Sequence, residues 1–277
     1  MNLWGEDIPD ALLTDEQACF LSEFTAKPRI TIEEMWRHLD VAWTAMALDR
    51  NRTEHGLARY YAHPVWILNG IFTATDPVSA GHRVAIAEWL SGKGGRRIAD
   101  FGGGGGQLAR SIAQAAPDAR VTIVEPNPSV ISRHRTEDFP GIRWSSALEG
   151  AYDAVIAQDV LEHLEDPVAV VGTLAASTRE GGHAIFANCF HPVIRCHLPE
   201  TFHLRHTFAW VIAPLGLLPV GIVPGAAHAG IFRRTAAEPR LDAARSRAAL
   251  ARLIAPILNP ALAATGHALR LMRKLAP

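Results

Sequence analysis

The sequence predicts an α/β protein with a parallel sheet and crossover helices, and three observations support this fold class. Between residues 91 and 235, short apolar segments alternate with helical segments, the order expected of strand–helix–strand units. Five consecutive glycines separate the first of these strands from the first helix. The flanking segments have helical patterns. We therefore expect an N-terminal helical region over 1–90, a sheet domain over 91–235 and a helical tail over 236–277.

Helices are expected throughout the first 90 residues. Asp15–Phe24 and Thr31–Arg50 carry apolar residues at helical spacing, and the N-terminus of the second segment resembles a capping box. The next stretch, Leu57–Phe72, is rich in rings, and Pro64 breaks or begins a helix there. These rings could wall a small-molecule pocket or form an ordinary helix–helix contact, and both interpretations stay open. The candidate pocket residues are Tyr60, Tyr61, His63 and Trp66.

Strands and helices alternate after the flexible joint Ser91–Gly95. Near-continuous apolar strands such as Val121–Val124 are expected where both faces of a sheet are covered. The other predicted strands are Arg97–Phe101, Ile142–Trp144, Tyr152–Ala157 and His183–Ala187. The predicted crossover helices are Gln107–Ala116, Ser129–Glu137 and Pro167–Ser177.

The segment Phe208–Phe232 contains no Asp, Glu, Lys or Arg and is long enough to span a bilayer. Three prolines interrupt it, however, with Gly216, Gly221 and Gly225 interleaved, and a lone helix in lipid could not satisfy so many broken backbone hydrogen bonds. We interpret it instead as a buried helix end followed by two core strands, Leu217–Val223 and His228–Arg233, joined at Pro224-Gly225.

The tail from Leu241 is rich in Ala, Leu and Arg and is expected to be helical, with Pro256 and Pro260 breaking it. Its basic residues give it an amphipathic pattern that fits a membrane surface. A helix that packs on the domain, or on the partner in a homodimer, is the favoured alternative. The basic residues are Arg240, Arg245, Arg247, Arg252, Arg270, Arg273 and Lys274.

Composition limits the classes of partner and compartment. The formal net charge is -1, from 27 basic and 28 acidic residues, and no basic stripe is evident, which argues against a nucleic-acid substrate. The three cysteines have no CxxC spacing, so we expect neither a disulfide framework nor a zinc knuckle, as in a reducing compartment. The first residues do not resemble a secretory signal, and a cytoplasmic location is expected.

The glycine run indicates a nucleoside site. Between a strand and a helix, glycines let the backbone approach a ligand closely, and the helix N-terminus beyond them offers free N–H groups. Glu125, at the end of the next strand, is placed to accept hydrogen bonds from ribose hydroxyls, although it could simply cap a turn. The relaxed dinucleotide pattern at Gly104, Gly106 and Ala109 keeps an NAD(P)-dependent oxidoreductase as an alternative.

Four motifs in order resemble the class I S-adenosylmethionine-dependent methyltransferase family over residues 85–235. They are Asp100-x-Gly-x-Gly-x-Gly, Val124-Glu125-Pro126, the strand Tyr152–Ala157 with its continuation Gln158-Asp159-Val160-Leu161-Glu162-His163-Leu164, and the turn Glu180-Gly181-Gly182. The last motif departs from the family in having Glu where Pro is usual. The resemblance implies a Rossmann-like, seven-stranded, mostly parallel sheet whose last strand is antiparallel.

The resemblance also implies S-adenosylmethionine as cofactor and methyl transfer to a small-molecule acceptor, such as a secondary-metabolite or sugar intermediate. Asp100 would orient the methionine amino end beside the backbone of Gly102, Gly104 and Gly106, and Glu125 would hold the ribose. Gln158 would line the methionine side. Where family members often have an acid that reads adenine, this chain has Ser146, which could still hydrogen-bond the base.

Methyl transfer needs a base only if the acceptor must lose a proton, and histidine suits that role near neutral pH. Five histidines fall between residues 183 and 206, and four of them follow the predicted strand His183–Ala187. We hypothesise that His191, His203 or His206 contacts the acceptor or acts as base, against the alternative that these are ordinary polar residues. His203 and His206 have an i, i+3 spacing that could bind a metal, but companion ligands are lacking and we expect none.

Two further alternatives concern the reaction. The absence of an Asn/Asp-Pro-Pro-Tyr/Phe tetrad after Ala157 weighs against methylation of nucleic-acid bases. A member of the fold could also use S-adenosylmethionine for other chemistry, such as cyclisation of its aminobutyl arm, or serve as a non-catalytic partner. The sequence leaves this alternative open, together with the identity of the acceptor.

Overall fold

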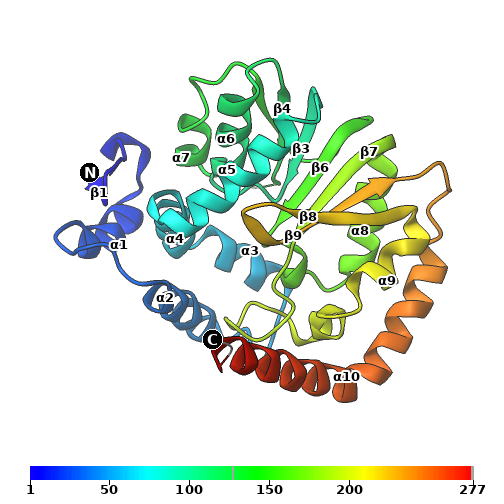
Figure 1. Cartoon of the computed structure of the whole chain (residues 1–277). Helices are drawn as coiled ribbons and strands as arrows, with labels where there is room; N and C mark the ends of the chain where they lie inside the picture. Colours follow the sequence, from blue (N-terminus) through cyan, green and yellow to red (C-terminus); the bar gives the residue numbers. More distant parts are fainter. Residues whose placement is uncertain (127, 276–277) are drawn as a thin grey trace.

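A seven-stranded sheet organises the chain (Figure 1), and its order is β5-β4-β3-β6-β7-β9-β8. A computed structural model describes residues 1–126 and 128–275, with side chains as far as residue 262. The first five strands in this order are parallel, and β9 runs antiparallel to both of its neighbours. The mostly parallel, seven-stranded fold predicted from the sequence is confirmed. The strands are β3 Arg97–Phe101, β4 Arg120–Val124, β5 Ile142–Ser145, β6 Tyr152–Gln158, β7 Thr178–Ala187, β8 Leu217–Val223 and β9 Ala226–Arg234.

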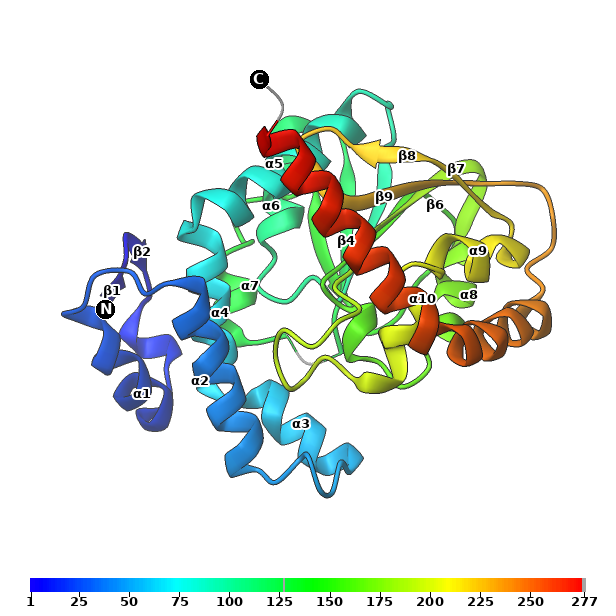
Figure 2. The ribbon, with the colours of Figure 1, turned by 60° about the horizontal axis from the view of Figure 1, so that its bottom comes forward.

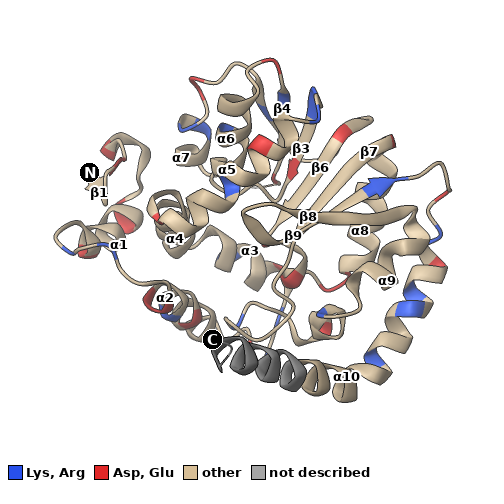
Figure 3. Ribbon diagram, viewed as in Figure 1, with Lys and Arg blue, Asp and Glu red and all other residues tan. Residues whose placement is uncertain are grey.

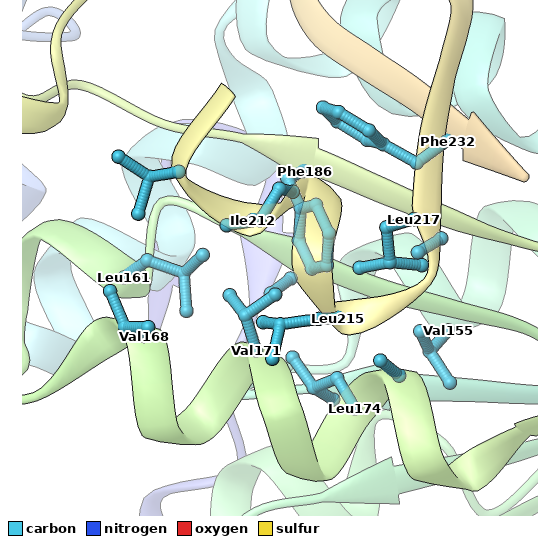
Figure 4. Packing of buried hydrophobic residues seen from close by; sticks show 14 of the residues in the cluster. Val155, Leu161, Val168, Val171, Leu174, Phe186, Ile212, Leu215, Leu217 and Phe232 are labelled. Carbon is cyan, nitrogen blue, oxygen red and sulfur yellow. The ribbon is translucent and has the colours of Figure 1, made fainter. Parts of the chain in front are cut away.

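Helices cover both faces of the sheet because the central strands are apolar on both sides. On one face, α5 Pro77–Ser91 and α6 Gln107–Ala115 bury Ile86 and Ile112 against strand residues such as Ile123. On the other face, α8 Pro167–Ser177, α9 Phe208–Ile212 and the first turns of α10 Leu241–Leu275 pack together. Figure 4 shows Val171 and Leu174 of α8 pointing into this second cluster.

The N-terminal helices lie together at one side of the sheet (Figure 1, Figure 2) and have their own core. That core also takes in Cys196 and Leu198 from the loop after β7, and Ile131 from α7 Val130–His134. The helical region therefore packs on loops that follow the carboxyl ends of the parallel strands. Its elements are the hairpin β1 Asn2–Leu3 and β2 Glu6–Asp7, η1 Asp10–Leu12, α1 Asp15–Thr25, α2 Ile32–Ala45, α3 Glu54–Ala62 and α4 Pro64–Thr75.

Local signals explain most of these helix ends. Thr14 and Thr31 each form a complete capping box, and Pro64 occupies the first turn of α4, where its missing N–H costs nothing. The predicted helix Thr31–Arg50 is too long, because α2 ends at Ala45. Ala47 takes a left-handed φ of 55°, which no helix accommodates.

The uncharged segment 208–232 forms α9, η4 Ala213–Leu215, β8 and β9, as the interpretation with two strands predicts. One detail of that prediction is wrong: β8 is not a core strand. It is the edge of the sheet, and Leu218, Val220 and Ile222 are about half exposed. An edge strand tolerates Pro219 because proline lacks an N–H, and the outer side of an edge strand has no neighbouring strand that needs this donor.

Among the helices described, none combines the length and the apolar character needed to cross a bilayer.

Helix α10 runs through Pro256 and Pro260, so the prediction that these prolines break it is wrong. Each proline removes one intrahelical hydrogen bond, and the helix continues because its neighbouring turns keep theirs. Arg245 pairs with Asp166, and Arg247 donates to the Trp210 carbonyl, so both hold α10 against the domain. The predicted basic side chains of Arg270, Arg273 and Lys274 lie outside the described residues.

Candidate active site

The glycine bend lies at the carboxyl end of β3, where it turns the chain into α6. Gly102 donates its N–H to the carbonyl of Val124 at 2.9 Å, which ties the bend to β4. Gly102, Gly104 and Gly106 have φ of 68°, 49° and 74°. A Cβ on Gly102 would lie 2.6 Å from Val160 Cγ2, so this position requires glycine for space as well as for conformation.

Asp100 lies beneath this bend with one oxygen unused. Its side chain is 2% exposed, and Oδ2 has no hydrogen-bond partner within the protein. Burial raises the pKa of Asp100 to about 7, against the opposing effect of the Arg83 charge. A Cβ on Gly103 would come within 2.6 Å of that oxygen. The site therefore combines a buried, uncommitted carboxyl with bare backbone, as the amino end of S-adenosylmethionine requires.

The predicted ribose and adenine positions follow at the ends of β4 and β5. Glu125 directly follows β4, is half-buried, and donates its N–H to the Ser145 carbonyl at 3.0 Å. Ser145 itself is engaged locally, since its hydroxyl donates to Glu149 or to the Ala147 carbonyl. Ser146 is exposed beside it. The structure thus brings Asp100, the glycines and Glu125 to one edge of the sheet, with Ser146 at its rim.

Arg83 is a residue that sequence reasoning missed. It extends from α5, is 7% exposed, and donates to the carbonyl of Thr73. The charges of Asp159, Asp100 and Asp76 oppose the burial that lowers its pKa. A cation held this close to Asp100 can bind the carboxylate of a ligand. Only the packing of α5 on the sheet reveals it, because a lone Arg in a helical pattern usually marks a solvated face.

A second buried cluster lies where the motif after β6 meets the loop after β7. Glu162 is fully buried, accepts the N–H of Cys189 through Oε1 at 2.9 Å, and leaves Oε2 without a partner. His163 Nδ1 lies 3.0 Å from the Cys196 carbonyl, and His197 Nδ1 lies 3.0 Å from that of His191. These contacts hold the two loops together.

The second cluster also bears on the expectation of no metal. One ligand atom from each of Glu162, His163 and His197 lies within 4.8 Å of the others. Burial raises the pKa of Glu162 to about 8 and lowers that of His163 to about 3, so both groups tend toward the neutral form. A carboxyl and two imidazoles are a donor set that a cation such as Zn²⁺ accepts. The absence of a metal stays a prediction.

The four aromatic candidates separate into two pairs. Tyr60 is fully buried in the helical core, and His63 caps α4 by accepting the N–H of Val65 at 3.1 Å. Tyr61 and Trp66 instead contact each other at 5.2 Å between ring centroids, and both rings meet His163 edge-on. Tyr61 remains 42% exposed, although Glu162 and Glu125 are close enough to raise its pKa beyond the effect of burial. This second pair faces the site.

The three candidate histidines lie apart. His191 is half-buried beside Cys189, with Sγ and Nδ1 3.5 Å apart. His203 lies within η3 Pro199–Leu204, is 6% exposed and leaves Nε2 unpartnered; burial, followed by the Arg252 charge of α10, lowers its pKa to about 4. His206 is exposed. The hypothesis that one of them contacts the acceptor stays a prediction; of the three, His191 touches the second cluster, since its carbonyl lies 3.0 Å from His197 Nδ1.

A cavity of about 640 Å³ opens between residues 40–52 and 192–202 and reaches His197. Its charges are largely paired: Arg52 contacts Glu200 and Arg195 contacts Asp49, each at 2.6 Å. Acidic and basic residues are interspersed along most of the described ribbon, and several basic positions are grouped on α10 (Figure 3).

Comparison with known proteins identifies the sheet region. Residues 79–211, just under half of the chain, match a family model described as a methyltransferase domain. The ubiquinone biosynthesis O-methyltransferase of Pectobacterium carotovorum is 27% identical over 160 residues, which cover 54% of this chain and 61% of that protein. Its counterpart from Vibrio parahaemolyticus is 29% identical over 131 residues, covering 44% and 56%. The chain spans about three-fifths of the length of the curated relatives it matches.

Solved structures share the fold. An O-methyltransferase family protein from Burkholderia thailandensis has a TM-score of 0.54 at 15% identity, covering 79% of this chain and 77% of that one. The mitomycin 7-O-methyltransferase has a TM-score of 0.53 at 18% identity, covering 81% and 74%. Human N-acetylserotonin methyltransferase, solved with S-adenosylmethionine, has a TM-score of 0.51 at 16% identity, covering 73% and 66%. At such identities the likeness concerns the fold alone.

Proposed function

We propose that the chain is a class I S-adenosylmethionine-dependent methyltransferase, which the methyltransferase-domain match over residues 79–211 supports, and that it methylates an oxygen atom of a small, flat acceptor molecule. The observation that carries this proposal is the buried Asp100 oxygen without a partner, beneath a glycine bend with no room for side chains. Glu125 stands at the end of the next strand. These features fit a nucleoside that carries an amino acid arm better than a dinucleotide, which carries a second phosphate.

The cofactor would be held by residues that lie in, or directly follow, five elements: α5, β3, β4, β5 and β6. Asp100 and the Gly102–Gly106 backbone would bind the amino end, Arg83 the carboxylate, and Glu125 the ribose hydroxyls. Gln158 and Ser146 would complete the methionine and adenine sides. When bound, S-adenosylmethionine supplies an already activated methyl group. The protein therefore contributes mainly alignment and exclusion of water.

The choice of a flat acceptor with a hydroxyl group rests on the aromatic pair and on the relatives. Tyr61 and Trp66 pack against each other and against His163, and Tyr61 is partly exposed, so the two rings can serve as a rigid apolar wall for an acceptor. The relatives are named as O-methyltransferases of ubiquinone biosynthesis, and a structural neighbour as a mitomycin 7-O-methyltransferase. An oxygen acceptor has to lose a proton, which makes a neighbouring base useful.

Three finer assignments belong to the same proposal. The three cysteines are free, as in a reducing compartment, and we place the protein in the cytoplasm. We keep the division into a helical cap over 1–90, a cofactor domain over 91–235 and a helical tail over 236–277. A homodimer contact or a membrane surface for α10 stays open; its exposed Leu253 and Ile257 would serve either.

Calorimetry tests the proposal directly. S-adenosylhomocysteine should bind the purified protein with a micromolar or lower Kd, and NAD should not bind under the same conditions. The protein should then convert S-adenosylmethionine to S-adenosylhomocysteine, and not to methylthioadenosine, when supplied with a panel of hydroxylated aromatic acceptors. Preferred binding of NAD, or release of methylthioadenosine, would exclude a methyltransferase.

A further inference from the structure

A group of polar side chains outside the sequence-predicted site gathers at the carboxyl end of β7. The register pairs Gln158 of β6 with Ala187 of β7, and Ala187 with Ala229 of β9. The neighbouring residues beyond these positions, Asp159, Asn188 and His228, therefore share one sheet edge. Because adjacent strands are about 4.8 Å apart, the ends of β6 and β9 lie roughly 10 Å from each other across β7.

Asp159 has an unusual backbone conformation. Its φ is 54°, in the left-handed region, and its N–H donates to the Ala187 carbonyl at 2.8 Å. The carboxylate accepts a hydrogen bond from Gln158 Nε2 at 3.3 Å. A non-glycine residue held in this region is strained, and such residues concentrate at functional sites. The conformation turns Asp159 away from the strand direction at the point where the strand ends.

Asn188 provides the second, independent observation. Its Oδ1 atom is buried and has no hydrogen-bond partner within the protein. A buried amide oxygen without a donor is unfavourable, and a ligand that supplies an O–H or N–H recovers that loss. The atom lies one residue beyond β7, between the ends of β6 and β9.

His228 completes the group from the opposite strand. It lies near the start of β9, just after the β8–β9 turn, and its ring contacts that of His82 on α5 at 4.5 Å between centroids. The turn itself packs closely on α5, because a Cβ on Gly225 would come within 3.1 Å of Ala85 Cβ. His228 remains exposed to solvent. Its ring is thus held in place while staying accessible to a ligand.

The charges around this group are defined. The basic groups that face Asp159 are His228 from β9, His82 and Arg83 from α5, and His197 from the loop after β7. Glu162 after β6 and Cys189 after β7 face it as well; burial raises the pKa of both, and the Asp159 charge adds to that effect. Burial lowers the pKa of His228, and the Asp159 charge opposes that effect. The negative charge of Asp159 favours the protonated form of His228, so this imidazole takes up a proton at a lower cost than burial alone would allow.

The position of the group relative to the cofactor residues suggests its role. Asp100, Glu125 and Gln158 occupy the ends of β3, β4 and β6, so the cofactor would cover that part of the edge. The next strands in the sheet are β7 and β9. An acceptor approaching the methyl group from this side would meet Asp159, Asn188 and His228 first.

We propose that His228 is the catalytic base for the acceptor hydroxyl, that Asp159 is its positioning residue, and that Asn188 Oδ1 accepts a hydrogen bond from a second donor on the acceptor. The inference rests on the proposed function. The hydroxyl proton passes to the free ring nitrogen of His228 and then to water. The oxygen lone pair forms the new O–C bond while the C–S bond of the sulfonium breaks, leaving its electron pair on sulfur.

A binding experiment without turnover tests this assignment. The protein is saturated with S-adenosylhomocysteine and titrated with 4-nitrocatechol, whose absorption changes when a hydroxyl loses its proton. The wild-type protein should bind the probe and raise its ionised fraction above that of the free probe at the same pH. His228→Gln should bring the bound probe back to the ionised fraction of the free probe. Asn188→Ala should weaken binding about tenfold, the scale of one lost hydrogen bond.

Asp159→Asn separates positioning from folding, because Asn tolerates left-handed φ and only the charge is lost. It should reduce the ionised fraction of bound 4-nitrocatechol while leaving the probe's Kd within about threefold of wild type. His134→Gln, an exposed histidine on α7, is the matched control and should change neither quantity.

The outcomes separate the two proposals. No binding of S-adenosylhomocysteine to wild-type protein removes the proposed function. Normal binding of S-adenosylhomocysteine with no binding of 4-nitrocatechol, or with an ionised fraction that His228→Gln leaves unchanged, overturns this inference alone. Binding of S-adenosylhomocysteine also reports whether a variant is folded. If His228→Gln no longer binds S-adenosylhomocysteine, His228→Asn replaces it in the same titration.

Discussion

The two ends of one sheet edge are built in different ways. At β3 and β4, the candidate cofactor residues come from a continuous stretch, Asp100 to Glu125, in which each turn follows directly from a strand. At β6, β7 and β9, the polar groups come from segments far apart in the chain, including His82, Asp159 and His228. The helical region adds Tyr61 and Trp66 to this second end.

The difference suggests which end is generic and which is particular to this chain. A bend made of backbone and one carboxyl recognises features that every S-adenosylmethionine molecule shares. Side chains from the cap and from the β8–β9 turn can change without disturbing that bend. We therefore expect substitutions at the first end to abolish cofactor binding, and substitutions at the second end to change acceptor use alone.

Gly102→Ala should have the largest effect. The new Cβ would lie 2.6 Å from Val160 Cγ2 at a φ of 68°, so the bend must move. We expect the affinity for S-adenosylhomocysteine to fall about a hundredfold or more, on the order of 3 kcal/mol. Gly94→Ala is the matched control, since it has a φ of 67° with nothing within 4 Å. Calorimetry showing equal losses for both variants would mean that backbone strain, and not the close approach, decides the effect.

Asp100→Asn should weaken the binding of S-adenosylhomocysteine by roughly tenfold to a hundredfold, because a charge-assisted hydrogen bond contributes about 1.5–3 kcal/mol. The same substitution should increase the stability of the unliganded protein at high pH. The folded-state pKa of Asp100 is raised to about 7, above its unfolded value of 3.8, so its contribution to the free energy of unfolding falls as pH rises between those values.

The unliganded Asp100→Asn protein should therefore be at least as stable as wild type at pH 8, and the advantage should disappear at pH 4. Thermal unfolding at both pH values measures this. A variant that is less stable than wild type at pH 8 would contradict a buried, reluctantly ionised Asp100.

Tyr61→Ala should raise the KM for an aromatic acceptor about tenfold, since its loss removes an apolar wall worth about 1.4 kcal/mol, and should leave cofactor affinity unchanged. Tyr60→Phe is the neighbouring control. Its ring stays in the helical core, while its hydroxyl loses the bond to the Leu39 carbonyl, 3.4 Å long, and the hydrogen bond with Cys196. If Tyr61→Ala weakens the binding of S-adenosylhomocysteine as strongly as it raises the KM of the acceptor, the cofactor end and the acceptor end of the sheet edge are not independent.

His206→Ala should have the smallest effect among these variants, because His206 is exposed. We expect kcat and KM within about twofold of wild type, as is usual for surface substitutions. His191→Ala provides the contrast, since His191 lies beside Cys189 near the second cluster. Steady-state kinetics in which His206→Ala loses most turnover would return the base to the position predicted from the sequence.

The predictability of each end follows from the range of its interactions. The strand Arg97–Phe101 and the helix Pro167–Ser177 match their predicted bounds, because an apolar run and a proline at the first turn act within a few residues. The half-exposed β8 and the uninterrupted α10 were not foreseen, because sheet order and helix packing decide them. Nor does any pattern separate the buried Tyr60 from its partly exposed neighbour Tyr61.

The sequence by itself determined the sheet, the glycine bend and the resemblance to the family, since these depend on apolar periodicity and on residues close together in the chain. Only the tertiary structure decided that Arg83 lies near Asp100, that Glu162 is buried beside two histidines, and that Asp159 and His228 share an edge. Contacts between distant segments depend on how strands order and helices dock. That information is spread over the whole core and appears in no local pattern.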